Sequence, residues 1–185
     1  IAGTPNTQAL AFNSLGQLYV GGAGNIKIIN PSTKATIGTI PNTAAAHSLA
    51  FDSAGNLYVG FIARKNIQVI NPSTKKIIGS IPNTSSTVAL AFDSAGTLYA
   101  SHSSVGILVI NPSTRMVTSN LANSSTSNVH ALAFQTKKLG NGSTISITLT
   151  LRTTGQYGKD RQFLKKDYFS GNFNFSKNDQ YNRDT

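Results

Sequence analysis

Residues 48–82 read SLAFDSAGNLYVGFIARKNIQVINPSTKKIIGSIP, and a similar stretch both precedes and follows them. Four short apolar runs of strand length lie within this stretch, at Ser48 to Phe51, Leu57 to Val59, Ile67 to Ile70 and Ile77 to Ile81. Repeating units of about 40 to 45 residues with four strands are typical of β-propeller blades. We therefore expect an all-β chain that forms a β-propeller, or part of one, from four-stranded antiparallel blades.

Two landmarks mark the repeat along the chain. A phenylalanine that follows Ala-Leu-Ala or Ser-Leu-Ala recurs at separations of 39, 41 and 42 residues, at Phe12, Phe51, Phe92 and Phe134. The tetrapeptide Asn-Pro-Ser-Thr begins at Asn30, Asn71 and Asn111. These landmarks assign residues 1–135 to propeller repeats, as three units and the first strand of a fourth.

The turns between the expected strands differ in how constant they are. Asp52-Ser53-Ala54-Gly55 starts with an Asx residue and ends with a glycine, where a positive φ is expected, and Asn71-Pro72-Ser73-Thr74 has a proline at its second position. Spacing around these turns is constant between units, whereas the other two connections vary in length. Alternate connections of a meander lie on one side, so the variable loops share a face, which is the predicted binding face.

Composition narrows the classes of protein that remain. The chain has 185 residues, no cysteine and no glutamate, so disulfides and thiolate metal ligands are excluded and every acid is an aspartate. Its net charge of +10 favours nonspecific contact with polyanions. No apolar run approaches the roughly 18 to 20 residues that span a bilayer, so no membrane span is predicted.

Both ends of the chain depart from the repeat. Ile1 to Pro5, followed by Asn6-Thr7, resembles the fourth-strand ending Ile40-Pro41-Asn42-Thr43, so the start either closes a ring or reflects truncation. Residues 136–185 carry a net charge of +5 and form a divergent basic segment, expected to complete a blade to about residue 152 and to be extended or flexible beyond it. Three units are fewer than the 4 to 8 blades of typical propellers. The tail, partner chains or a longer parent protein would have to supply the remainder.

Two parts of the unit resemble known repeat families. Ala-Phe-Asp-Ser-Ala-Gly-Asn-Leu-Tyr-Val, at residues 50–59, resembles the core of NHL repeats. Ile-Asn-Pro-Ser-Thr-Lys-Lys-Ile-Ile-Gly-Ser-Ile-Pro, at residues 70–82, resembles the second half of the YVTN-type repeats of bacterial and archaeal surface propellers. The resemblance covers about residues 1–135 and implies the propeller fold. It implies no single function, because these families include ligand-binding domains, surface-layer proteins and a few enzymes.

Six residues are candidates for a binding rim on the variable-loop face. Gln8, His47 and His130 lie four residues before a landmark phenylalanine, at the entrance of the innermost strand. Arg64, Lys65 and His102 lie in the loops between second and third strands. The basic loop residues form either a modest anion-binding rim or ordinary solvated charges.

The sequence predicts no metal site, cofactor or catalytic residue. The two equivalent histidines could hold a metal or act as an acid and a base. The other units have Gln8 and Val88 at the same position of the repeat, which indicates that the histidines are polar residues of the rim. No glutamate is present to supply a third metal ligand. Asp52 and Asp93 are expected to cap backbone N–H groups in their turns rather than to form a catalytic pair.

We therefore expect a non-catalytic interaction module, secreted or exposed on the cell surface. It would bind a protein or a polysaccharide through the variable-loop face, and incomplete blades would allow assembly into a homo-oligomer. The alternative is a channel-rim enzyme, lyase-like or lactonase-like, that uses His47 and His130. Sequons at Asn83, Asn123, Asn141 and Asn174 matter only in an organism that glycosylates them.

Overall fold

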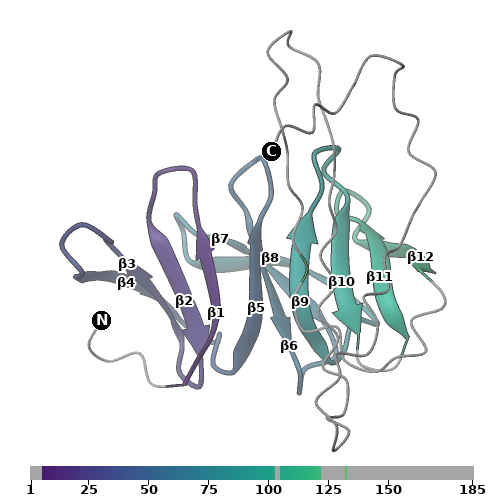
Figure 1. Cartoon of the computed structure of the whole chain (residues 1–185), viewed down its shortest axis with the longest axis horizontal. Coiled ribbons are helices and arrows are strands. Elements are labelled where there is room, and N and C mark those ends of the chain that lie inside the picture. Colours follow the sequence, from purple (N-terminus) through teal and green to yellow (C-terminus); the bar gives the residue numbers. More distant parts are fainter. Residues whose placement is uncertain (1–5, 103–104, 122–131, 133–185) are drawn as a thin grey trace, which may run out of the picture. The chain divides into compact units, whose positions relative to one another are not determined.

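The computed structural model describes residues 6–102, 105–121 and 132, and these residues contain three antiparallel four-stranded sheets (Figure 1). Blade 1 comprises β1 (Thr7–Phe12), β2 (Leu18–Gly22), β3 (Ile26–Ile29) and β4 (Thr36–Ile40). Blade 2 comprises β5 (Ala46–Phe51), β6 (Leu57–Phe61), β7 (Ile67–Asn71) and β8 (Lys76–Ile81). Blade 3 comprises β9 (Thr87–Phe92), β10 (Leu98–His102), β11 (Gly106–Asn111) and β12 (Met116–Leu121).

Each sheet is an up-and-down meander in which consecutive strands pair. The predicted strands of the middle unit agree with β5 to β8 to within two residues at each end. Every regular element in the described ranges is a strand, and no helix there has the length and apolarity needed to cross a membrane. The chain is therefore an all-β partial propeller, which confirms the predicted fold class.

Adjacent blades bury their faces against one another. The first strands are neighbours, since β1 contacts β5 and β5 contacts β9. One hydrophobic cluster joins Tyr19 and Ile28 of blade 1 to Leu57 of blade 2. A second cluster joins Tyr58 of blade 2 to Leu98 of blade 3. Because the core lies between sheets, every blade depends on its neighbours for burial.

An aromatic pair links each blade to the next. The ring of Tyr19 meets that of Phe51 edge to face, with centroids 4.9 Å apart and planes at 77°. Tyr58 and Phe92 repeat this contact at 5.0 Å and 77°. The interval between phenylalanine and tyrosine is constant within a unit, and the structure pairs Phe51 and Phe92 each with the tyrosine of the preceding blade. Such pairs add about 0.5–1.5 kcal/mol to the effect of burial alone.

A basic side chain makes a second link between blades. Lys75 and Arg115 follow the Asn-Pro-Ser-Thr turns and have φ of 57° and 56°. In each turn the asparagine side-chain oxygen accepts hydrogen bonds from the N–H groups of the serine and the threonine. A Cβ atom on Gly79 would overlap the Arg115 guanidinium, and one on Gly38 would lie 3.4 Å from Lys75 Nζ. The cation of one blade thus lies over a glycine in the fourth strand of the preceding blade.

A buried threonine fixes the corner between blades. The Ile26 N–H donates to Thr43 Oγ1 (2.8 Å), and the Thr43 hydroxyl donates to the Ile40 carbonyl (2.7 Å). Thr84 makes the equivalent bonds to Ile67 and Ile81, and both threonines are fully buried. These connections were predicted to be variable, but the two that the structure describes share one hydrogen-bonded scaffold.

The corner can be tested by removing one hydroxyl. We expect Thr84→Val to lower the free energy of unfolding by about 1–3 kcal/mol, because the buried Ile67 N–H and Ile81 carbonyl lose their partner. Thr74→Val, at an exposed position, makes the same chemical change and should stay within about 0.5 kcal/mol of the parent chain. Denaturant unfolding measures both. Equal losses in the two variants would contradict a structural role for the corner.

Candidate functional site

Asp52 and Asp93 cap the turns between the first and second strands of blades 2 and 3, as predicted from the sequence. The Asn56 N–H donates to Asp52 Oδ1 (2.8 Å), and the Gly55 N–H donates to the Asp52 carbonyl (3.1 Å) with Gly55 at φ 82°. Asp93 Oδ1 accepts the N–H groups of Ala95 (2.9 Å) and Thr97 (2.8 Å). Both carboxylates in the described residues are therefore engaged as caps within their own turns.

The same aspartates bond to the second-strand tyrosines of blades 2 and 3. The Tyr99 hydroxyl donates to Asp93 Oδ2 (3.3 Å), and the Tyr58 hydroxyl is hydrogen-bonded to Asp52. Burial of Tyr58, together with the nearby Asp52 charge, raises the pKa of the Tyr58 phenol to about 12. Burial likewise raises the pKa of Tyr19 and of Tyr99. The turn, the tyrosine and the next blade are thus physically connected.

These shifts predict the behaviour of the chain at high pH. Tyrosine in an unfolded chain ionises near pH 10, so a raised pKa means that the folded state binds this proton more tightly. The stabilisation is complete below about pH 10 and is lost as the pH rises toward 12. Tyrosinate absorbance should show Tyr58 ionising last among the described tyrosines, and Tyr58→Phe should remove that step. Ionisation of all tyrosines together near pH 10 in the folded chain would contradict this.

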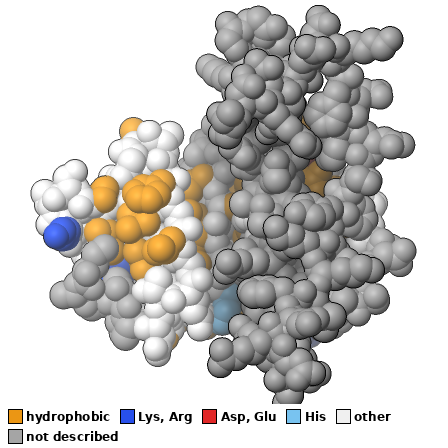
Figure 2. Space-filling model, in the orientation of Figure 1, with side chains coloured by type: hydrophobic (Ala, Val, Ile, Leu, Met, Phe, Trp, Pro, Cys, Tyr) orange, Lys and Arg blue, Asp and Glu red, His pale blue; other side chains and the backbone are white. Residues whose placement is uncertain are grey.

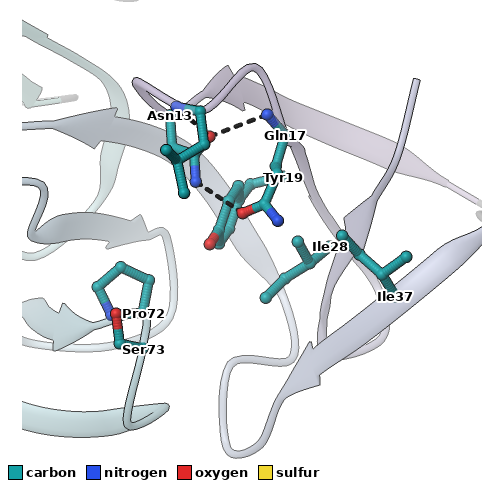
Figure 3. Close-up of a pocket in the computed structure, with 8 residues that line it drawn as sticks. Asn13, Gln17, Tyr19, Ile28, Ile37, Pro72 and Ser73 are labelled. Atoms are coloured by element: carbon teal, nitrogen blue, oxygen red, sulfur yellow. Dashed lines mark hydrogen bonds between the residues drawn. The ribbon is translucent and has the colours of Figure 1, made fainter. Parts of the chain in front are cut away.

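A small pocket lies between blades 1 and 2 on the side of the rigid turns (Figure 3). Its volume is about 200 Å³, and its lining residues are Asn13, Leu15, Gln17, Tyr19, Ile28, Ile37, Pro72 and Ser73. Asn13 Nδ2 donates to Gln17 Oε1 (2.8 Å), so two polar side chains of the lining bond to each other. Sites for organic ligands usually measure about 300–1,000 Å³. The pocket is smaller than such sites, and it lies on the face predicted to be scaffold.

On the variable-loop face, Arg64 bonds to a neighbouring corner. Its Nη1 donates to the Asn42 carbonyl (2.9 Å) and its Nη2 donates to the Ala44 carbonyl (3.2 Å). Its guanidinium carbon lies 4.1 Å from the centroid of the Phe61 ring, a cation–π distance. The sequence offered Arg64 as either an anion-binding residue or a solvated charge, and the structure shows that its guanidinium holds the loop to the corner before β5.

The loop that contains Arg64 is also held on its other side. The Ser86 N–H donates to the Ile62 carbonyl (3.3 Å), and the Thr84 N–H donates to the Lys65 carbonyl (3.1 Å). The loop at residues 62–66 is therefore fixed between the corner before β5 and the corner before β9. It presents an isoleucine that is 45% exposed and an exposed lysine.

The remaining predicted rim residues are placed as follows. Gln8 and His47 are the second residues of β1 and β5, at the entrance of the innermost strand, as predicted. Gln8 is exposed, and half-buried His47 has Nδ1 3.0 Å from the Ala45 carbonyl. His102 ends β10, with Nε2 3.5 Å from Ser85 Oγ. His130 lies outside the described residues, so its geometry relative to His47 is not tested. No group of three or more His or acidic residues within the described ranges could hold a metal ion.

The sequence pointed to the loop at residues 61–66, but it did not predict two contacts on this face, the stacking of Arg64 on Phe61 and the threonine corner. Phe61, which carries Arg64, stands where blade 1 has Gly22 and blade 3 has His102, so the clamp is specific to blade 2. Pro-Asn-Thr recurs at residues 41–43 and 82–84, where its threonine forms the corner. The residue change at one position of the repeat marked a contact specific to blade 2, and the tripeptide repeated in a loop of variable length marked a structural corner.

Comparison with known proteins supports the fold and leaves the family open. No protein-family model and no curated protein sequence matches the chain. Among solved structures, the Kuenenia stuttgartiensis hydrazine synthase matches with a TM-score of 0.65 and 17% identity, over 82% of this chain and 44% of that one. A Bacteroides caccae protein of unknown function matches with a TM-score of 0.55 and 17% identity, over 78% and 57%. At this identity the likeness concerns the fold alone, and the chain spans about half of each matched structure.

Proposed function

We propose that the chain is a non-catalytic β-propeller interaction module that makes contact through the loop at residues 62–66. The observation that carries this proposal is the double attachment of the loop, through Arg64 on one side and the Thr84–Ser86 corner on the other. A loop that is already ordered loses little conformational entropy when a partner binds. Ile62 and Lys65 are therefore presented in a fixed arrangement.

The chemistry of this loop favours a partner with acidic groups beside an apolar surface. Ile62 is 45% exposed, and Lys65 adds a positive charge three residues further on. The net charge of +10 would attract such a partner from a distance. An acidic protein surface can supply both properties, and an acidic polysaccharide supplies the charged one.

We also propose the repeat family and the location of the protein. The assignment to an NHL-type or YVTN-type repeat is supported by the sequences of residues 50–59 and 70–82. A secreted or cell-surface location rests on the resemblance to surface propellers. The alternative, a channel-rim enzyme, requires His47 and His130 together. The described residues include His47 alone, so that alternative stays a prediction without support from the geometry.

The charged part of the proposal is tested with heparin as an acidic polysaccharide probe. Lys65→Ala should weaken heparin binding at low salt by about twofold to fivefold, equivalent to roughly 0.5–1 kcal/mol for one exposed charge contact. Lys76→Ala makes the same charge change at an exposed position beside a rigid turn, and it should have a smaller effect. Both variants retain the basic segment at residues 136–185. Equal losses would show that net charge alone determines binding.

The apolar part can be separated by salt. Ile62→Ser should weaken the binding that remains at high salt, where the charge contribution is screened. Ile77→Ser is the matched control, because Ile62 and Ile77 are exposed to 45% and 47%. An unchanged affinity of Ile62→Ser at both salt concentrations would remove the loop from the contact surface.

A further inference from the structure

Blade 1 has a face that differs in exposure from the same face of the other blades. Leu10 and Phe12, on β1, are 61% and 60% exposed. Leu49, equivalent to Leu10, is 7% exposed in blade 2, and Phe51, equivalent to Phe12, is half-buried against Tyr19. Figure 2 shows hydrophobic side chains gathered on the described surface of blade 1. The same positions of the repeat are thus covered in blade 2 and open in blade 1.

We infer that this open face of blade 1, formed by Leu10 and Phe12 of β1 with Lys34 of the β3–β4 turn, is a docking site for a further four-stranded blade of the same repeat. The inference is independent of the loop proposed above. It rests on the contacts that β5 and the β7–β8 turn of blade 2 make with blade 1, since β1 and the β3–β4 turn have the corresponding residues. An ordinary exposed patch would not reproduce three separate elements of an existing interface.

The contacts between described blades define the occupant. Phe12 requires a second-strand tyrosine, as Phe51 meets Tyr19 and Phe92 meets Tyr58. Lys34 has φ 57°, as Lys75 does, and Lys75 lies over Gly38 of the preceding blade. The occupant therefore needs a glycine in its fourth strand below Lys34. A blade with the sequence of residues 41–81 has both features, at Tyr58 and Gly79.

The residues before β1 have the sequence of a blade-to-blade corner. Asn6 has φ 54°, which matches Ala45 at 63° and Ser86 at 53° in the corners before β5 and β9. Counting back from Asn6 places Ile1 and Thr4 at the positions of Ile40 and Thr43. The sequence alone aligned Asn6-Thr7 with Asn42-Thr43, whereas the backbone aligns Asn6 with Ala45, three residues further on.

The register defines an extended chain with which to test the inference. Residues 41–80 are copied and joined directly to Ile1, so that Ile1 takes the place of Ile81 and the full 185-residue chain follows. Phe12→Ala is then measured in both chains by thermal unfolding. In the parent chain the midpoint should hardly change, because the ring is 60% exposed. In the extended chain the midpoint should fall by about as much as Phe51→Ala lowers it in the parent.

Two controls make the outcome specific. Met116→Ala changes a residue of matched exposure, 61%, on β12, and should have the same small effect in both chains. Tyr58→Ala in the added segment should abolish the extra effect of Phe12→Ala, because it removes the receiving ring.

Three results would overturn the inference. The first is an equal effect of Phe12→Ala in the two chains. The second is an extended chain that is less stable than the parent or fails to fold. The third is a parent dimer, seen by light scattering, that Phe12→Asp dissociates, since a second copy would then be the occupant of this face.

Discussion

The edge-to-face contact between a tyrosine of one blade and a phenylalanine of the next is the interaction on which the rest of the structure depends. It pairs Tyr19 with Phe51 and Tyr58 with Phe92 in nearly identical geometry. Each tyrosine also reaches the turn of its own blade, since the hydroxyl of Tyr58 is hydrogen-bonded to Asp52 and that of Tyr19 to Asn13. The turn therefore helps to set the position of the tyrosine, and the tyrosine helps to set the position of the following blade.

The hydrogen-bonded corners extend this scaffold onto the face that the sequence assigned to binding. Thr43 and Thr84 fix the connections between blades from within, and Arg64 bonds to the carbonyls of one such corner. Among the described residues of that face, blade 2 differs from its neighbours in the support that Phe61 gives to Arg64. The loop proposed as the contact surface is thus a single loop that two repeated corners support.

Repetition also explains why blade 1 is informative. Leu49 of blade 2 is buried, whereas the equivalent Leu10 of blade 1 is exposed. This difference shows that the preceding blade covers this position of the repeat. Burial of apolar surface is the main favourable term in folding. The contacts that cover this face in blade 2 therefore indicate what kind of surface would cover the same face in blade 1. The likeness to the two larger solved structures, of which this chain spans 44% and 57%, concerns the same architecture.

The sequence by itself determined the strands, the turns and the repeat, and hence the propeller class. These features depend on neighbouring residues: Asp52 and Gly55 close one turn locally, and alternating side chains define the strand between turns. Only the tertiary structure decided which residues meet between blades. The spacing of Phe51 and Tyr58 is constant between units and says nothing of their partners, whereas packing gave each ring a partner in a different blade. Arg64 shows the same limit, because its carbonyl partners at Asn42 and Ala44 are brought within reach only when the corner between blades 1 and 2 folds beside its loop.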